Sequence, residues 1–257
     1  MWTVTRLIVR RPAAQAGFFF TLQSLARSAP HRVTIAASIA VGFSLVVITL
    51  AGNDLHRPGS LAATPLSMLV LQTLLLGAVL TGFRHVVRVP AEVRTNWTFH
   101  VAWSGDERPY LMGVKRAAMS VLVAPTLLLI WRTDVFILGP RVALAHAATG
   151  LCVALLLMEM LFVSYRKLPF ASGYVRSEVL QSVGPLYLVA MLISAVALAG
   201  LERAALTSVP GEVAFFGALA ATIISVHALD TSRRRTRVPI DLDELPSGPT
   251  QRLELTR

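Results

Sequence analysis

The sequence predicts an all-α integral membrane protein, with six transmembrane helices preceded by an amphipathic helix at the membrane interface. Of its 257 residues, 54% are hydrophobic and 15% are charged, whereas soluble domains carry about 25% charged residues. The hydrophobic residues form long runs with few charges, and about 20 helical residues suffice to cross the roughly 30 Å hydrocarbon core of a bilayer. Connections that are rich in lysine and arginine alternate along the chain with connections that are poor in them. This composition argues against a water-soluble enzyme.

The first predicted element is a short amphipathic helix within residues 1–32, a segment that we assign to the cytoplasm. Residues 12–26 are too few to cross a bilayer and include several polar side chains, while phenylalanine and leucine recur at the spacing of one helix face. We expect this helix to lie in the interface, with Phe18, Phe19 and Phe20 in the acyl region. A cleaved signal peptide is not expected, because arginines follow the apolar stretch in place of a cleavage site.

Six transmembrane helices are expected to follow, forming one domain over residues 33–229. The third and sixth runs carry charged residues only near their first turns, where long side chains can reach the interface. Pro65, Pro125 and Pro185 fall within predicted spans, where proline can bend a helix. The predicted spans are 33–52, 61–83, 111–131, 142–165, 179–201 and 209–229.

Orientation follows from the basic residues, because the cytoplasmic connections of membrane proteins are rich in lysine and arginine. Of the 24 basic residues, 20 lie in the segments that six spans place on the side of both termini, and 4 lie on the opposite side. We therefore expect a multi-pass protein of the cell (inner) membrane with both termini in the cytoplasm. The last segment, 230–257, opens with arginines and then turns acidic among prolines, which predicts a disordered tail whose basic part binds anionic lipid.

The connections between the spans predict where a soluble partner would bind. The outward connections, 53–60, 132–141 and 202–208, leave no room for an extracellular domain, so a partner is expected on the cytoplasmic side. The longest connection, 84–110, is cytoplasmic in this topology. The residues that we expect to contact such a partner are Arg84, Arg88, Glu92, Arg94 and Trp97.

Sequence patterns of intramembrane enzymes and of ATPases are absent from the sequence. It has no H-E-x-x-H zinc signature, no G-x-S-x-G nucleophile turn and no phosphate-binding loop. We therefore expect no enzymatic activity, no cofactor and no metal site. The net charge of +10 does not indicate a nucleic-acid partner, because the basic residues flank the spans. The single cysteine, Cys152, lies within a span and is interpreted as a packing residue.

Glu159 and His146 are the candidate polar site within the membrane. Glu159 is the acidic residue that lies well inside a predicted span, where a carboxylate is either a substrate or proton site or the partner of a basic group. Arg84, Arg116 and Arg166 are the basic groups that could approach it. His146 lies near the outer end of the same helix, about 20 Å away at 1.5 Å per residue. The two side chains therefore cannot share one metal ion.

Taken together, these features resemble the permease subunit of ABC-2-type exporters. In that family an interfacial helix before the first span serves as an elbow, and the connection after the second span docks on a separate ATPase subunit. The resemblance implies these roles for residues 12–26 and 84–110. The sizeable extracellular hairpin that usually separates the last two spans of the family is replaced here by residues 202–208. The stretches Phe18–Leu22 and Pro90–Trp97 also look like segments of uncharacterised bacterial multi-pass membrane proteins.

Two functions remain as hypotheses. The first is a permease-like subunit of an exporter, energised by a separate cytoplasmic ATPase and assembled as a homo- or hetero-oligomer. The second is a non-transporting membrane scaffold or assembly factor that recruits partners through its basic cytoplasmic face. In both, the lipid bilayer is a partner and nucleic acid is not.

Overall fold

A computed structural model describes residues 11–51, 65–89, 107–163, 169–170 and 178–235. Across these ranges every regular element is helical, which confirms the predicted all-α class. Six helices are long and apolar enough to cross a membrane, as judged by length and composition. The elements are α2 (Pro12–Arg27), α3 (Ala29–Ala51), α4 (Leu66–Arg88), α6 (Glu107–Ala118), the π-helical segment η2 (Met119–Val123), α7 (Ala124–Leu138), α8 (Pro140–Val163), α9 (Glu178–Ala205) and α10 (Val209–Arg235).

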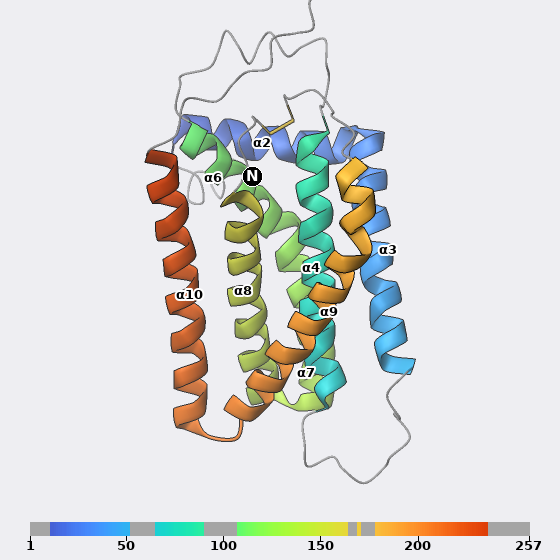
Figure 1. The fold of residues 1–257 in the computed structure, drawn as a ribbon, viewed down its shortest axis with the longest axis vertical. Helices are drawn as coiled ribbons and strands as arrows, with labels where there is room; N and C mark the ends of the chain where they lie inside the picture. The colour runs from blue at the N-terminus through green and yellow to red at the C-terminus, as the bar shows by residue number, and fades with distance from the viewer. Residues whose placement is uncertain (1–10, 52–64, 90–106, 164–168, 171–177, 236–257) are drawn as a thin grey trace, which may run out of the picture.

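Helix α2 lies across one end of a bundle that the long helices form (Figure 1). The chain turns sharply at Ser28, whose backbone is extended between α2 and α3. His31, fully buried in the first turns of α3, fixes this corner, because its ring contacts the Ser28 hydroxyl and its Nε2 lies 3.1 Å from the carbonyl oxygen of Val89, just beyond α4. The last turns of α10 lie at the same end of the bundle as α2 (Figure 1).

The centre of the bundle is α4, which packs against α3, α8 and α9. Within its most apolar stretch 67% of the residues are buried, against 6% in α3 and 6% in α10. Its inner residues Leu76, Leu80 and Phe83 share a core with Met158 and Phe162 of α8. Helices α3 and α10 therefore present mostly apolar outer faces, as expected of helices that border lipid.

The third predicted span is a continuous helix, made of α6, η2 and α7 and apolar enough to cross a membrane over Arg108–Leu138. The π turn of η2 ends at Val123, two residues before Pro125. Proline has no N–H to donate to the carbonyl four residues back and its ring crowds that carbonyl, so a wider turn relieves the contact. Pro125 thus produces a local change of helix pitch. Pro65, by contrast, precedes the first residue of α4 and bends no span.

Two connections that the sequence assigned to the outer side are shorter than predicted. Helix α7 continues to Leu138, so Gly139, with φ of 81°, is the one residue between α7 and α8. Helix α9 continues to Ala205. The predictions had ended these spans at residues 131 and 201 because charged residues follow, whereas the structure buries two of those residues, Asp134 and Glu202, inside the bundle.

Candidate functional site

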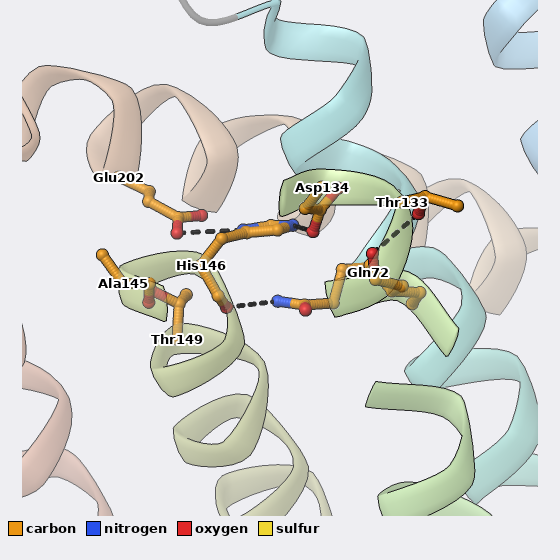
Figure 2. Close-up of polar contacts among 8 residues, drawn as sticks. Gln72, Thr133, Asp134, Ala145, His146, Thr149 and Glu202 are labelled. Atoms are coloured by element: carbon orange, nitrogen blue, oxygen red, sulfur yellow. Dashed lines mark hydrogen bonds and ion pairs between the residues drawn. The ribbon is translucent and has the colours of Figure 1, made fainter. Parts of the chain in front are cut away.

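The strongest candidate site surrounds His146, at the end of the bundle opposite α2. Three helices contribute one ionisable side chain each: Asp134 from α7, His146 from α8 and Glu202 from α9 (Figure 2). Their exposed fractions are 3%, 0% and 2%. His146 lies six residues beyond Pro140, the first residue of α8, and so about 9 Å into the helix. We call these three residues the outer cluster, after the side on which the predicted orientation places them.

The imidazole of His146 lies between the two carboxylates. Its Nδ1 is 3.0 Å from Glu202 Oε1, a hydrogen-bond distance, whereas its Nε2 is 3.9 Å from Asp134 Oδ2. Neither Nε2 nor Oδ2 has a hydrogen-bond partner among the described residues. Since an ionised carboxylate only accepts hydrogen bonds, Nδ1 donates its hydrogen to Glu202, and this contact favours the Nδ1–H tautomer.

Helix α4 contributes a contact to the backbone of His146. The amide Nε2 of Gln72 donates to the carbonyl oxygen of His146 at 2.7 Å (Figure 2). Glycine at position 150 makes this contact available, because a Cβ there would overlap the Gln72 amide. The position of His146 is therefore set by α4 as well as by its own helix.

The outer cluster is suited to holding a proton and not to holding a metal ion. Its carboxylates approach opposite nitrogens of one ring, so they do not converge on one point, and the described residues include no group of three or more ligands that could hold a metal ion. Within the same residues, neither carboxylate is paired with lysine or arginine. Burying an unpaired charge costs free energy. A proton bound within the cluster would reduce the net negative charge of the two carboxylates and therefore this cost.

Glu159 belongs to a second polar cluster, nearer the α2 end of the bundle. Its Oε2 lies 2.8 Å from the Nζ of Lys115 on α6, and its Oε1 lies 3.6 Å from the Nδ1 of His227 on α10. Lys115 also lies 5.7 Å from the ring centre of Phe162, within cation–π range. We call Lys115, Glu159 and His227 the inner cluster.

The sequence left open whether Glu159 is a substrate or proton site or the partner of a basic group, and the inner cluster favours the second. The basic group that pairs with its carboxylate is Lys115, which was not among the basic groups expected from the sequence, and Arg166 lies outside the described residues. Glu159 and His146, taken together as one candidate site in the sequence, occur in two separate clusters near the two ends of α8. Glu159 thus has the surroundings expected of a structural ion pair.

The predicted partner contacts are placed only in part. Arg84 and Arg88 lie in the last turns of α4, and both are half-buried. Glu92, Arg94 and Trp97 lie outside the described residues.

Helices α2 and α6 cross with their backbones in close contact. A Cβ on Gly17 of α2 would overlap the carbonyl oxygen of Tyr110, and a Cβ on Gly113 of α6 would overlap that of Ala14. Phe18 packs beside this crossing against Ala117. Paired glycines let helix backbones approach more closely than any side chain would allow, so α2 is fixed to the beginning of the third span.

Asp134, Glu202 and Gln72 are the residues of this site that the sequence did not reveal. Asp134 and Glu202 were assigned to outward connections, because a charged residue after an apolar run is the usual sign of a span's end. One signal was present. Both acids fall at the outer ends of their spans, at the depth of His146, and a buried histidine needs polar partners.

The fold and the outer cluster define a class: within its described ranges the chain is all-helical, with six helices suited to crossing a membrane and with ionisable side chains buried between them. Comparisons with family models, with curated proteins and with solved structures found no match to this chain.

Proposed function

We propose that the chain is the membrane-embedded, permease-like subunit of an exporter, energised by a separate cytoplasmic ATPase. In this proposal the six helices cross the cell (inner) membrane, both termini are cytoplasmic, and α2 lies in the cytoplasmic interface. The observation that carries it is the crossing of α2 and α6 at Gly17 and Gly113.

The crossing supports the proposal because of what precedes α6 in the chain. Residues 90–106 join α4 to α6 on the side that is rich in basic residues. A partner that moves this connection also moves Glu107, the first residue of α6. Because α2 is fixed to α6 backbone to backbone, the displacement would pass to α2 and, through the corner at His31, to α3 and α4. A binding scaffold needs no such mechanical link.

The buried ionisable residues agree with transport. Charged side chains inside membrane helices are rare, face the bundle interior and commonly line substrate or ion pathways. Among the described residues they come from α6, α7, α8 and α9, and Asp230 of α10 is also buried.

The first test asks whether an ATPase accompanies the chain. The full chain, tagged at its C-terminus and expressed from its own chromosomal locus, is purified from native membranes in mild detergent, and bound proteins are identified by mass spectrometry. The expected result is a stoichiometric ATPase whose hydrolysis rate changes when the complex is reconstituted into lipid vesicles. Purification of a well-folded chain with no ATPase overturns the proposal and favours the scaffold.

The second test asks whether the crossing transmits the motion. Gly113→Ala places a methyl group against the Ala14 backbone, whereas Gly217→Ala, on the outer face of α10, places it where no other atom lies within 4 Å. We expect Gly113→Ala to retain the bound ATPase but to reduce the response of its hydrolysis to the permease by tenfold or more, with Gly217→Ala unchanged. An equal response in both variants contradicts a mechanical role for the crossing.

A further inference from the structure

We infer that the outer cluster is a proton-binding site, in which one proton added to Nε2 of His146 joins α7 to α8 and α9. The ligand is a proton from water at the outer end of the bundle. The inference is independent of the proposed ATPase partner, because it concerns residues at the opposite end of the bundle.

The first step is the gap between His146 and Asp134. With Nδ1–H donated to Glu202, the neutral ring turns a lone pair of Nε2 toward Oδ2 of Asp134, and the 3.9 Å between these atoms is too long for a hydrogen bond. Neither atom has another hydrogen-bond partner in the described part of the chain. Nε2 and Oδ2 thus face each other without a hydrogen bond between them.

The second step is what a proton does there. One N–H bond forms at Nε2, the proton donor is hydronium in the outer solvent, and water is released. The imidazolium then donates from both nitrogens, and a charge-assisted N–H···O bond has a length of about 2.7–2.9 Å. Closing the gap from 3.9 Å to this length draws Asp134 and α7 toward α8. The Glu202 contact is strengthened at the same time, because both partners then carry charge.

The third step is the charge that surrounds the ring. Helix α7 contributes Asp134, α9 contributes Glu202 and α4 contributes the uncharged amide of Gln72. The charged side chain from α10 nearest this end, Glu212, is already paired with Arg141 of α8 at 2.9 Å. Two further side chains, Arg132 and Arg203, are exposed. The groups that face the ring are thus two carboxylates, one at each ring nitrogen.

The depth of the cluster allows the proton to reach it. Asp134 lies four residues before the end of α7 and Glu202 three residues before the end of α9, so both lie about 5–6 Å from a helix end. This is near enough to the surface for exchange with water, while the ring itself is fully buried. The site therefore senses the pH of one side of the membrane.

Nitrogen NMR of histidine tests the inference directly. The full chain, labelled with ¹⁵N-histidine and reconstituted in phosphatidylcholine nanodiscs, is titrated between about pH 4.5 and 9. The His146 signals are assigned by their loss in His146→Gln. We expect a single Nδ1–H tautomer at alkaline pH and a doubly protonated ring at acidic pH. A ring in one unchanging state across the whole range overturns the inference.

Matched variants separate a proton site from an ordinary buried histidine. Asp134→Asn is expected to lower the fraction of doubly protonated His146 at least threefold at a pH where half of the wild-type rings are charged, because one attracting carboxylate is lost. His227→Gln, in the inner cluster, should leave the His146 titration unchanged. If His146→Gln does not fold, the assignment is made by removing the other five histidines, His31, His56, His85, His100 and His227, in turn. Equal titrations in wild type and Asp134→Asn would contradict the role given to Asp134.

Discussion

Lys115 and Glu159 show how one residue pair can place a charge inside an apolar bundle. Their side chains are mostly buried and their charged atoms are 2.8 Å apart. Such a pair need not stabilise the fold relative to two apolar residues, yet removing one member leaves the other charge uncompensated. The pair should therefore behave as a unit under mutation.

We predict that Glu159→Gln lowers the free energy of unfolding by about 1–3 kcal/mol, less than the 3–5 kcal/mol of a fully buried pair. Lys115→Gln should have a similar effect, and the double variant should cost clearly less than the two single variants together. SDS-induced unfolding of the purified protein measures these differences. Strictly additive losses would mean that the two charges do not interact.

His227 provides the control for this cycle. Its Nδ1 is 3.6 Å from Glu159 Oε1, but its side chain is largely exposed. His227→Gln should therefore change the stability by no more than about 0.5 kcal/mol.

Phe18 and Phe19 lie on different faces of α2. Phe18 is 7% exposed and packs on α6, whereas Phe19 is 37% exposed. Phe20 is half-buried against the ring of Phe170. The expectation that all three rings reach the lipid was therefore wrong for Phe18, because it treated the helix as lying on an empty surface. The sequence shows that one face is apolar, but not that a second helix covers it.

We predict that Phe18→Ala lowers the free energy of unfolding by about 3 kcal/mol, the lower end for a buried phenylalanine. Phe19→Ala should cost less than about 1 kcal/mol, because its ring makes fewer protein contacts. The same SDS titration compares the two variants. Equal losses would argue against the packing of α2 on α6.

Among the helical elements, the π turn η2 sets the rotation of α7 about its axis, and with it the residues of α7 that face the bundle. A π turn adds one residue to a helix that is otherwise α-helical. Each residue turns an α-helix by about 100°, so the extra residue changes the direction of every side chain that follows. Asp134 lies eleven residues beyond the end of η2 at Val123, and its direction toward His146 depends on this turn.

We predict that deleting Ser120, an exposed residue within η2, restores a continuous α-helix and turns Asp134 away from His146. Because α6 is fixed by α2, the rotation should fall on α7. The ¹⁵N titration of His146 in the deletion variant should then match that of Asp134→Asn. Ser120→Ala keeps the chain length and should titrate like the wild type; a normal titration in the deletion variant would show that α7 keeps its register.

The number of spans could be predicted from the sequence, whereas the ends of two of them could not. Uncharged runs of about 20 residues predicted six spans, and six helices of that kind are present. The ends of α7 and α9 could not be predicted, because Asp134 and Glu202 are buried by contacts with another helix. For the same reason His146 could be selected from its position in a span, but its partners could not.

At the scale of the whole molecule, the topology can be tested without knowing the function. The alternation of basic residues predicts that both termini and residues 84–110 are cytoplasmic, with the ends of α7 and α9 outside. Cysteine is introduced singly at positions 58, 105 and 245 after Cys152→Ala, which leaves one reactive thiol in each variant.

We predict that a membrane-impermeant maleimide added to intact cells labels the cysteine at position 58 and not those at 105 or 245. Opening the membrane should make all three reactive. The reverse pattern would invert the orientation and would place the outer cluster on the cytoplasmic side.

The crossing of α2 and α6 has a consequence for how the protein is made. Gly17 and Gly113 are separated by about 100 residues, which a ribosome adds in roughly 5–20 s. Helix α2 is therefore synthesised long before the surface that covers it. Throughout that interval the apolar side that carries Ala14 and Phe18 needs another covering, and we expect the lipid headgroup boundary to supply it. On this view the amphipathic character of α2 serves the nascent chain first, and α6 later takes the place of the lipid.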